Sequence, residues 1–459
     1  MSAAVSQLRQ TLQQRWDRAA HVPEAPEATD FREELFVIKR RIHRSILASA
    51  DLDALNALPV EAQRAELGER ADRFLRQANI SVNQPEREWI RQAVRSEILG
   101  LGPIDALLED PTVSDILVNG PAMIYVERAG RLQRSRLHFE DDAHLLRIIG
   151  RIVSRVGRRI DESNPMVDAR LADGSRVNAI IAPLALDGPV LSIRRFSVTP
   201  YSMQDLIAFG TLDPALAKVL TALVAGRANI LISGGTGSGK TTLLNVMSTA
   251  IAADQRIITI EDAAELQLRQ THVVRLETRS ANIEGQGEVS QRELLRNALR
   301  MRPDRIVVGE VRGHEVIDML QAMNTGHEGS MTTVHANSPL DAVTRLEHML
   351  EMAGMPASPS ILRRQIASAL TVVVQISRLS DGSRRVTSLM ELDGADGTEY
   401  RTSEIFKFEQ HGVEVDGAVR GRIQATGARP LFVERLRSRG IELPDSLFIH
   451  TGTGLDAEP

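Results

Sequence analysis

The sequence predicts an α/β protein, and three observations support this fold class. From residue 201 onward, apolar strand-like runs alternate with helical runs, which is typical of a parallel sheet covered on both faces. Between Asn229 and Met247, an apolar run leads through a glycine-rich turn into a helical run. Before residue 201, short alternating runs predict a separate unit of strands and hairpins.

Composition limits the classes of function that the 459 residues can serve. The length indicates two or three domains. A net charge of −5 and an aromatic content of 3% do not favour a protein that binds nucleic acid. The absence of cysteine excludes disulfides and thiolate metal sites. Neither the first residues nor the apolar run Ile366–Val374 has the features of a signal peptide or a membrane span, so we expect a cytoplasmic protein.

Changes in pattern along the chain predict its domains. Residues 1–30 are predicted to be a flexible tail, because "HVPEAPEATD" is rich in proline and acidic residues. Residues 31–108 are predicted to be a helical domain, because their apolar residues recur at spacings of three and four. A linker is expected at 197–201, followed by the alternating strands and helices of 202–459.

Residues 109–196 are predicted to form an α+β domain of strands, hairpins and one helix. Hairpin turns are expected at Ala129–Gly130 and at Ala172–Gly174, between runs of strand-like residues. An amphipathic helix is expected over 142–160. Within it Arg147, Arg151 and Arg155 share one face, which we expect to be solvated or to contact a subunit or an acidic partner loop.

The segment Asn229–Met247 carries the strongest local motif, G-x-x-x-x-G-K-[ST]. Its glycines let backbone N–H groups point at phosphate oxygens, and the following helix adds its positive dipole end. Lys240 is expected to reach the β- and γ-phosphates of ATP, and the Thr241 hydroxyl is expected to bind Mg²⁺. Only four of the 55 basic Lys and Arg residues are lysines, so a lysine here is informative. The predicted nucleotide-binding residues are Gly234, Gly235, Thr236, Gly237, Ser238, Gly239, Lys240, Thr241 and Thr242.

Two acidic residues follow apolar strand-like runs. Glu261 ends the run that starts at Arg256, and Glu310 ends the run that starts at Asp304. The carboxyl ends of parallel strands meet at one edge of a sheet, so both carboxylates should face the nucleotide. One of them could hold Mg²⁺ through water while the other orients the attacking water. An acidic residue after a strand can also be an ordinary turn residue.

Two histidines, His327 and His335, lie eight residues apart. They do not form an H-E-x-x-H metal site, because Met331 occupies the place of the second histidine. If the segment between them is extended, the histidines are about 26 Å apart and cannot share a metal ion. The run "SMTTVHA" predicts a parallel strand, so His335 should emerge at the ligand-binding edge, near the γ-phosphate or Glu310. His327 should face the other way, and packing alone remains an alternative for both.

These motifs resemble one known family. "GGTGSGKTT", "TIEDAAELQL", "NALRMRPDRIVVGEVRG" and "QAMNTGHEGSMTTVHANSP" resemble the secretion-superfamily ATPases, and the CpaF branch that drives Tad/Flp-type pili is the most similar. The resemblance covers about residues 31–450. It implies a RecA-like P-loop NTPase domain, a PAS-like α+β N-terminal domain and an extra N-terminal helical bundle. It also implies a homohexamer that hydrolyses ATP with Mg²⁺ and works on inner-membrane pilus platform proteins.

The same resemblance implies roles for individual residues. Glu261 lies in an aspartate-box motif as the general base, and Glu310 is the Walker B acid, which also serves as a metal ligand. His327 and His335 lie in a histidine box, which implies a role for both; strand geometry, rather than the resemblance, favours His335 for hydrolysis and leaves His327 as a coupling residue. Arginines from the N-terminal domain are expected to reach the nucleotide, or else to be structural: Arg176, Arg194 and Arg195. The chain departs from many type II secretion ATPases in lacking their cysteine-rich zinc module.

The sequence therefore predicts an ATP-hydrolysing motor for Tad/Flp pilus assembly, and possibly for retraction. It is expected at the inner face of the inner membrane, held there through partners, with no nucleic acid as a partner. Two other functions stay open, a type IV secretion ATPase and a RecA-like translocase of nucleic acid. A small-molecule kinase is disfavoured, because nothing resembles an acceptor site.

Overall fold

The computed structural model describes residues 33–49, 54–55, 57–128, 131–195, 201–279, 281, 286–355, 357–415 and 417–450. The predicted tail, the turn at Ala129–Gly130 and the linker up to residue 200 lie outside these ranges. The chain divides into two compact units, residues 1–197 and 198–459, and each is described by itself. No helix within the described ranges is both long and apolar enough to cross a membrane.

The first unit begins with helices packed around a small apolar core. Leu67, Ile90 and Val94 are among its fully buried side chains. Helix α5 starts at a capping box, in which the Asn83 side chain and Glu86 each accept a backbone N–H from the other residue. The elements of this part are α2 (Glu33–Ser49), α4 (Val60–Gln77), α5 (Gln84–Ile98), η1 (Gly102–Ile104) and α6 (Asp105–Glu109).

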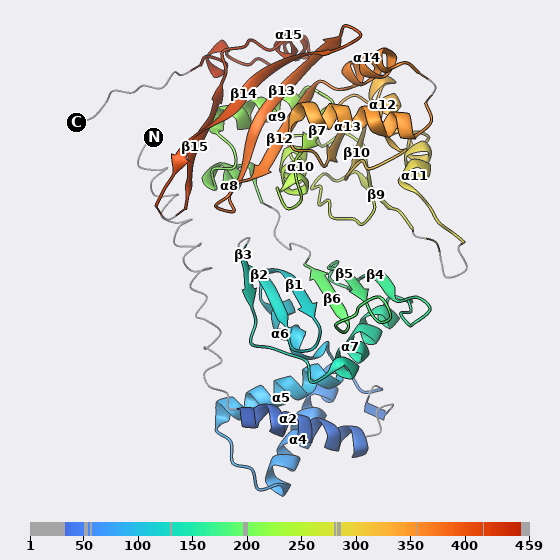
Figure 1. The fold of residues 1–459 in the computed structure, drawn as a ribbon, viewed down its shortest axis with the longest axis vertical. Coiled ribbons are helices and arrows are strands. Elements are labelled where there is room, and N and C mark those ends of the chain that lie inside the picture. The colour runs from blue at the N-terminus through green and yellow to red at the C-terminus, as the bar shows by residue number, and fades with distance from the viewer. Residues whose placement is uncertain are drawn as a thin grey trace, which may run out of the picture. The chain divides into compact units, whose positions relative to one another are not determined.

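Within the described residues, the rest of the first unit is a six-stranded antiparallel sheet with one face covered by helix α7 (Figure 1). The strand order is β3-β2-β1-β6-β5-β4. The predicted helix over 142–160 ends earlier, because Gly157 follows it with φ of +68° and stops it. The elements are β1 (Val113–Asn119), β2 (Ile124–Arg128), β3 (Arg131–Arg134), α7 (Asp142–Arg155), β4 (Met166–Arg170), β5 (Arg176–Ile180) and β6 (Val190–Arg194).

The arginine face of α7 contacts the end of α5. Arg151 donates to the carbonyl oxygens of Glu97 and Gly100, and Arg155 donates to that of Leu99. The last carbonyls of a helix have no partner within the helix and favour positive charge. The expected solvated stripe is therefore wrong for the half-buried Arg151, whereas Arg155 remains exposed beside its carbonyl partner.

A buried cluster of charged groups also joins these parts. Lys39 of α2 pairs with Glu97 of α5, and His144 Nε2 of α7 lies 2.7 Å from the other Glu97 oxygen. Lys39, Glu97 and His144 are at most 6% exposed. Burial opposes ionisation of Glu97, but the hydrogen bond from His144 and the charge of Lys39 outweigh it and lower the pKa of Glu97 to about 2.

We expect Glu97→Gln to lower the free energy of unfolding of the first unit by about 3 kcal/mol. Among the residues that the structure describes, the change leaves the buried Lys39 with the Glu140 carboxylate, 4.0 Å away, as its remaining acidic partner. Because the pKa of Glu97 is depressed, its contribution is complete above about pH 4.5 and is lost as the pH falls toward 2. Urea unfolding at neutral and acidic pH measures both effects. The double variant Glu97→Gln, Lys39→Met should recover part of the loss, and equal stability of wild type and Glu97→Gln would contradict this account.

The second unit is built on a large mixed sheet (Figure 1). Its nine described strands have the order β15-β14-β13-β12-β7-β11-β10-β8-β9. The parallel part of the sheet has the spatial order β12-β7-β11-β10-β8-β9. The antiparallel part has the order β15-β14-β13-β12. The strands are β7 (Ile230–Ser233), β8 (Ile257–Glu261), β9 (Val273–Glu277), β10 (Arg305–Val308), β11 (Met331–Val334), β12 (Val372–Arg378), β13 (Arg384–Ala395), β14 (Tyr400–Val413) and β15 (Val419–Ala425).

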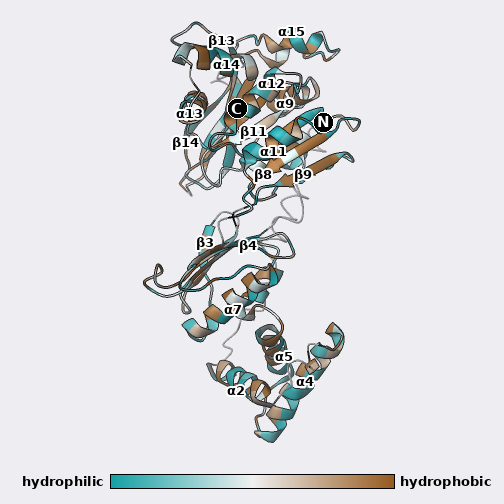
Figure 2. Cartoon of the chain, turned by 90° about the vertical axis from the view of Figure 1, so that its right-hand side faces the viewer, coloured by the Kyte–Doolittle hydropathy of each residue, from teal (hydrophilic) through white to brown (hydrophobic). Residues whose placement is uncertain are grey.

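Helices cover both faces of the parallel part, as the α/β prediction requires. One apolar core packs α8, α9, α10 and α15 against the sheet, and a second core packs α11 to α14 against the opposite face. Figure 2 shows strand β8 in hydrophobic colours and helix α11 with hydrophilic and hydrophobic residues. The helical elements are α8 (Met203–Ala208), α9 (Pro214–Ala225), α10 (Lys240–Ser248), α11 (Gln291–Ala298), α12 (Val316–Asn324), α13 (Pro339–Met352), α14 (Pro359–Ala369), α15 (Phe432–Arg437) and η2 (Asp445–Leu447).

One buried side chain forms hydrogen bonds to the backbone near the first residues of the central strands. Asn229, 3% exposed, immediately precedes β7. Its amide nitrogen donates to the carbonyl oxygens of Met323 and Ala369, at 3.2 and 2.6 Å. Its amide oxygen accepts the N–H groups of Gly329 and Ser330, at 2.8 and 3.1 Å. The start of β11 is therefore held against the start of β7 by side-chain hydrogen bonds as well as by the strand ladder.

Candidate active site

The phosphate-loop motif forms the turn between β7 and α10. Gly237 and Gly239 have φ of +69° and +98°, a region that side chains with a Cβ rarely adopt. Gly234 cannot carry a side chain either, because a Cβ there would lie 2.3 Å from the carbonyl oxygen of Ile376. The loop thus takes the strand-turn-helix form that the sequence predicts. Thr241 and Thr242 lie in the first turn of α10.

Lys240 is the first residue of α10, and its side chain folds back over the loop. Its Nζ donates to the carbonyl oxygens of Gly234 and Gly235, both at 3.0 Å. The residue is 7% exposed, and burial lowers the pKa of its ammonium group, although Glu310 opposes the shift. A desolvated cation at the start of a helix suits the binding of a phosphate group.

His335 follows the last residue of β11 and lies beside Lys240 at the same edge of the sheet. Its Nε2 is 2.9 Å from Glu310 Oε1, and both ring nitrogens are 3.4 Å from Lys240 Nζ. Burial lowers the pKa of His335, with Glu310 opposing the shift, and this lowering favours the neutral form of the ring. In the tautomer with the proton on Nε2, a neutral ring can offer this N–H to Glu310 and leave Nδ1 able to accept from Lys240. The predicted position of His335, near the phosphate loop and Glu310, agrees with this geometry.

Glu310 stands two residues after the end of β10, on a backbone held from both sides. The N–H of Gly309 donates to Ile260 of β8, and the N–H of Val311 donates to Thr333 of β11, at 2.8 and 2.9 Å. The hydroxyl of Thr333 donates to the carbonyl oxygen of Gly309 at 2.8 Å. The position of the Glu310 backbone is therefore set by the two neighbouring strands.

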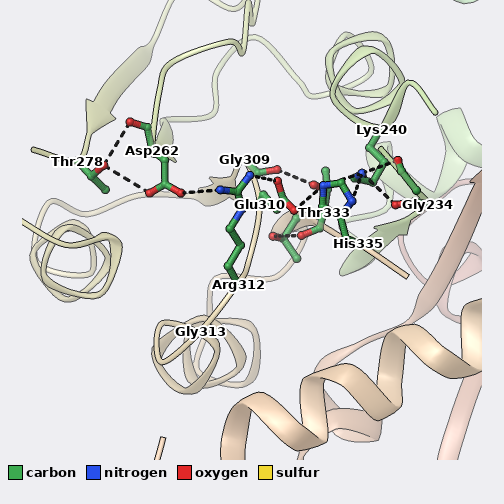
Figure 3. A network of polar contacts seen from close by, with 12 residues as sticks. Gly234, Lys240, Asp262, Thr278, Gly309, Glu310, Arg312, Gly313, Thr333 and His335 are labelled. Carbon is green, nitrogen blue, oxygen red and sulfur yellow. Dashed lines mark hydrogen bonds and ion pairs between the residues drawn. The ribbon is translucent and has the colours of Figure 1, made fainter. Parts of the chain in front are cut away.

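The polar network continues outward through a residue that sequence reasoning missed (Figure 3). Arg312 NH2 donates to Glu310 Oε2 at 2.8 Å, and its NH1 lies 3.8 Å from Asp262 Oδ2. Thr278 donates to the backbone oxygen of Asp262 at 3.2 Å. Arg312 lies two residues after Glu310, a spacing that returns a side chain to the same face in extended backbone. That spacing is the signal by which the sequence could have indicated it.

Glu261 ends β8, and its carbonyl oxygen accepts the N–H of Thr278 at 3.0 Å. Among the described residues, its side chain bonds to the backbone of its own loop rather than to the side chains of this network. It is 3% exposed, and its Oε1 accepts the N–H groups of Glu265 and Leu266 at 2.7 and 2.9 Å. Its side chain packs on Gly309, where a Cβ would lie 2.8 Å from Glu261 Cγ. Burial raises the pKa of Glu261, although its backbone hydrogen bonds oppose the shift. A raised pKa increases the proton affinity that a general base requires.

The oxygen donors at this edge suit Mg²⁺ better than a softer metal. Magnesium is usually held by one or two protein oxygens together with water and substrate phosphates. The Thr241 hydroxyl and the Glu310 carboxylate are hard donors of this kind. Within the described ranges, no three His, Asp or Glu side chains gather as a metal site of their own. The donor set fits an ion that arrives with a nucleotide.

His327 lies at the other end of β11 from His335. It precedes the strand, its backbone N–H donates to Ala322, and its carbonyl oxygen accepts from the Ser330 hydroxyl. Glu328 next to it pairs with Arg435 and Arg439. The two histidines therefore lie at opposite ends of β11, as predicted, although the segment between them is not extended throughout, because a turn at Glu328 and Gly329 precedes the strand.

The arginines predicted from the first unit lie at one end of its sheet. Arg176 and Arg194 are cross-strand partners in β5 and β6. Arg194 is 54% exposed at its side chain and pairs with Asp115 at 3.2 Å. Arg195 instead donates hydrogen bonds to the carbonyl oxygens of Asp110 and Val113, and these bonds hold the backbone at the start of β1.

Comparison with known proteins shows the family to which the chain belongs. Residues 97–424 match the family model described as "Type II/IV secretion system protein". The chain belongs to this family. With its phosphate loop, lysine and carboxylates at one strand edge, this member of the type II/IV secretion family is an ATPase.

Several known proteins are similar to this chain in sequence. A putative conjugal transfer protein of Mycobacterium tuberculosis (strain H37Rv) is 41% identical over 312 residues, which cover 67% of this chain and 88% of the relative. Conjugal transfer protein TrbB of Rhizobium radiobacter is 32% identical over 307 residues, covering 66% and 91%. Type IV secretion system protein VirB11 of Bartonella henselae is 30% identical over 347 residues, covering 67% and 96%.

The chain is also similar to solved structures, of which two are described. The VirB11 ATPase of Brucella suis is 28% identical, with a TM-score of 0.34, and the match covers 62% of this chain and 94% of that one. The pilus retraction motor PilT with bound ADP is 21% identical, with a TM-score of 0.45, and covers 74% and 86%.

An experiment can distinguish the roles of the two carboxylates, Glu261 and Glu310, in this secretion ATPase. We expect Glu261→Gln to keep ATP and Mg²⁺ binding but to slow turnover about 10²-fold or more, the loss expected when a general base is removed. Glu310→Gln should in addition weaken the dependence on Mg²⁺. Magnesium titrations of nucleotide binding and of turnover compare the two variants. Identical titrations would argue against separate roles.

Proposed function

We propose that this secretion-family ATPase is the motor of a Tad/Flp-type pilus and drives assembly through inner-membrane platform proteins. The observation that carries the hydrolytic part is the meeting of Lys240, His335 and Glu310 at one strand edge. The choice of machine is supported by the sequence resemblance to the CpaF branch. It is also supported by the helices over 33–96, which precede the matched region at 97–424.

The side chains suggest how hydrolysis proceeds. The loop N–H groups and Lys240 bind the phosphates of ATP, and Mg²⁺ supplies neutralisation of the developing charge. His335, neutral and hydrogen-bonded to Glu310, orients that carboxylate and can donate to the γ-phosphate when it is present. Glu261, with its raised pKa, is the proposed acceptor of the proton from the attacking water.

The proposed assembly is a homohexamer of subunits with a PAS-like domain at 109–196 and a RecA-like domain at 202–459. In it, Arg194 and Arg176 complete the nucleotide site from the N-terminal domain, because arginine forks bind phosphate well. Mixing Arg194→Ala with Lys240→Ala subunits tests this sharing. Recovered turnover would require completion across an interface, and turnover should rise more steeply than linearly with protein concentration during assembly.

A second candidate function is a type IV secretion or conjugation ATPase. The observation that favours it is that the relatives similar in sequence include conjugal transfer proteins and the type IV secretion protein VirB11. Its catalytic chemistry would be the same, so only the machine that the ATPase serves separates the two functions.

A chromosomal Lys240→Ala strain distinguishes the two machines. Surface pili are counted with a labelled pilin, and plasmid transfer and protein secretion are measured in the same cells. Loss of pili with normal transfer and secretion supports the pilus motor. Normal pili with lost transfer or secretion overturns the pilus proposal in favour of the second candidate.

A further inference from the structure

Each oxygen of the Glu310 carboxylate contacts one protein group. His335 Nε2 lies 2.9 Å from Oε1, and Arg312 donates to Oε2 at 2.8 Å. Each oxygen keeps a second lone-pair direction, so a metal ion or a metal-bound water competes with these partners only where it approaches along the direction that one of them takes. The Glu310 side chain is 18% exposed, so its charge is largely compensated by protein rather than by solvent.

Arg312 is the partner that is free to leave. Its side chain is 60% exposed, whereas that of His335 is 32% exposed. The backbone beneath Arg312 is fixed, because Glu315 Oε1 accepts the N–H groups of Arg312 and Gly313 at 2.6 and 2.9 Å. A fixed backbone with an exposed guanidinium allows the side chain to change partners by rotation alone.

A second carboxylate lies within reach of the same guanidinium. Arg312 NH1 is 3.8 Å from Asp262 Oδ2, and Figure 3 shows the guanidinium between Glu310 and Asp262. Asp262 is 46% exposed at its side chain, and the Thr278 hydroxyl holds its backbone oxygen. An arginine can bind two carboxylates at once through its fork or shift toward either one.

We propose that Arg312 is an exchangeable counter-cation for Glu310, which it releases to Mg²⁺ by moving to Asp262. The inference rests on the proposed assignment of Glu310 to the metal. Arg312 is a positioning residue, because it acts through the availability of the Glu310 carboxylate. Asp262 is the acceptor that lowers the cost of its release.

The test measures how binding of a fluorescent ATP analogue depends on Mg²⁺ concentration in the purified full chain. Arg312→Gln removes the competitor and should lower the half-saturating Mg²⁺ concentration about two- to fivefold, the range for a partly exposed ion pair. Asp262→Asn should raise it by a similar factor. Arg312→Lys should fall between wild type and Arg312→Gln. Arg292→Gln, which removes an arginine that pairs with Asp318 instead, is the matched control and should leave it unchanged.

The double variant separates partner exchange from a simple change of local charge. If Asp262 acts only through Arg312, then Asp262→Asn has no further effect in the Arg312→Gln background. Additive effects of the two substitutions would overturn the exchange, as would unchanged Mg²⁺ dependence in both single variants. Glu310→Gln tests the underlying assignment. If Glu310→Gln shifts the titration and the Arg312 and Asp262 variants do not, the exchange fails while the role of Glu310 stands.

Discussion

Lys240→Ala is expected to reduce ATP turnover by at least about 10²- to 10³-fold, the loss seen when one charge-stabilising donor is removed. In the structure, Nζ bridges the carbonyl oxygens of Gly234 and Gly235 and lies beside His335. No other lysine can substitute, because the three others lie elsewhere in the sequence, at 39, 218 and 407. Pilus assembly should be lost together with turnover.

The fold should survive Lys240→Ala. Burial lowers the pKa of this ammonium group, which means that burying its charge costs free energy in the folded state, so removing the charge should not lower stability. Lys218→Ala, at an exposed position of α9, is the control and should keep full turnover. Phosphate release and thermal unfolding measure the two properties. Normal turnover in Lys240→Ala would falsify the assignment of the phosphate loop.

His335→Ala is expected to lose most of its hydrolysis while nucleotide affinity changes only several-fold. The substitution removes the ring that lies 2.9 Å from Glu310 and 3.4 Å from Lys240, so Glu310 loses the partner that orients it. The phosphate loop itself keeps its N–H groups and its lysine. Turnover should fall by about 10²-fold, the lower range for a positioned proton-transfer or orienting group.

Two matched histidine variants sharpen this result. His348→Ala changes an exposed residue of α13 in the same unit and should have no effect. His327→Ala, at the other end of β11, should reduce motor output more than basal hydrolysis. Unchanged turnover in His335→Ala would contradict the proposed geometry, as would activity that zinc-selective chelation removes and zinc restores.

The α/β fold was predictable because its signals are local. The apolar runs ending at Glu261 and Glu310 and the glycine turn before Lys240 each specify one element from a few neighbouring residues. The end of α7 was misplaced because Gly157 stops the helix although the apolar pattern continues through Ile160. That outcome depends on backbone geometry rather than on hydrophobicity.

The sequence predicts the positions of those site residues that directly follow parallel strands. His335 and Glu310 follow adjacent parallel strands, so their meeting follows from topology. The link from Arg312 to Asp262 depends on side-chain rotamers, which no spacing rule supplies. The contacts of Arg151 with the end of α5 were missed for a related reason, because a helical pattern identifies a polar face without identifying the element that meets it.

The amide of Asn229 gives the central sheet a mechanical property. It ties the start of β7 to the start of β11 and to Ala369, the last residue of α14, which precedes β12. A push on the loop that carries His327 would therefore be shared by these strands, which should shift together as one stiff body. The spacing between Lys240 and His335 at the far edge would stay nearly constant under such a load. Force could then be passed through the sheet without deforming the group of side chains that hydrolyses ATP.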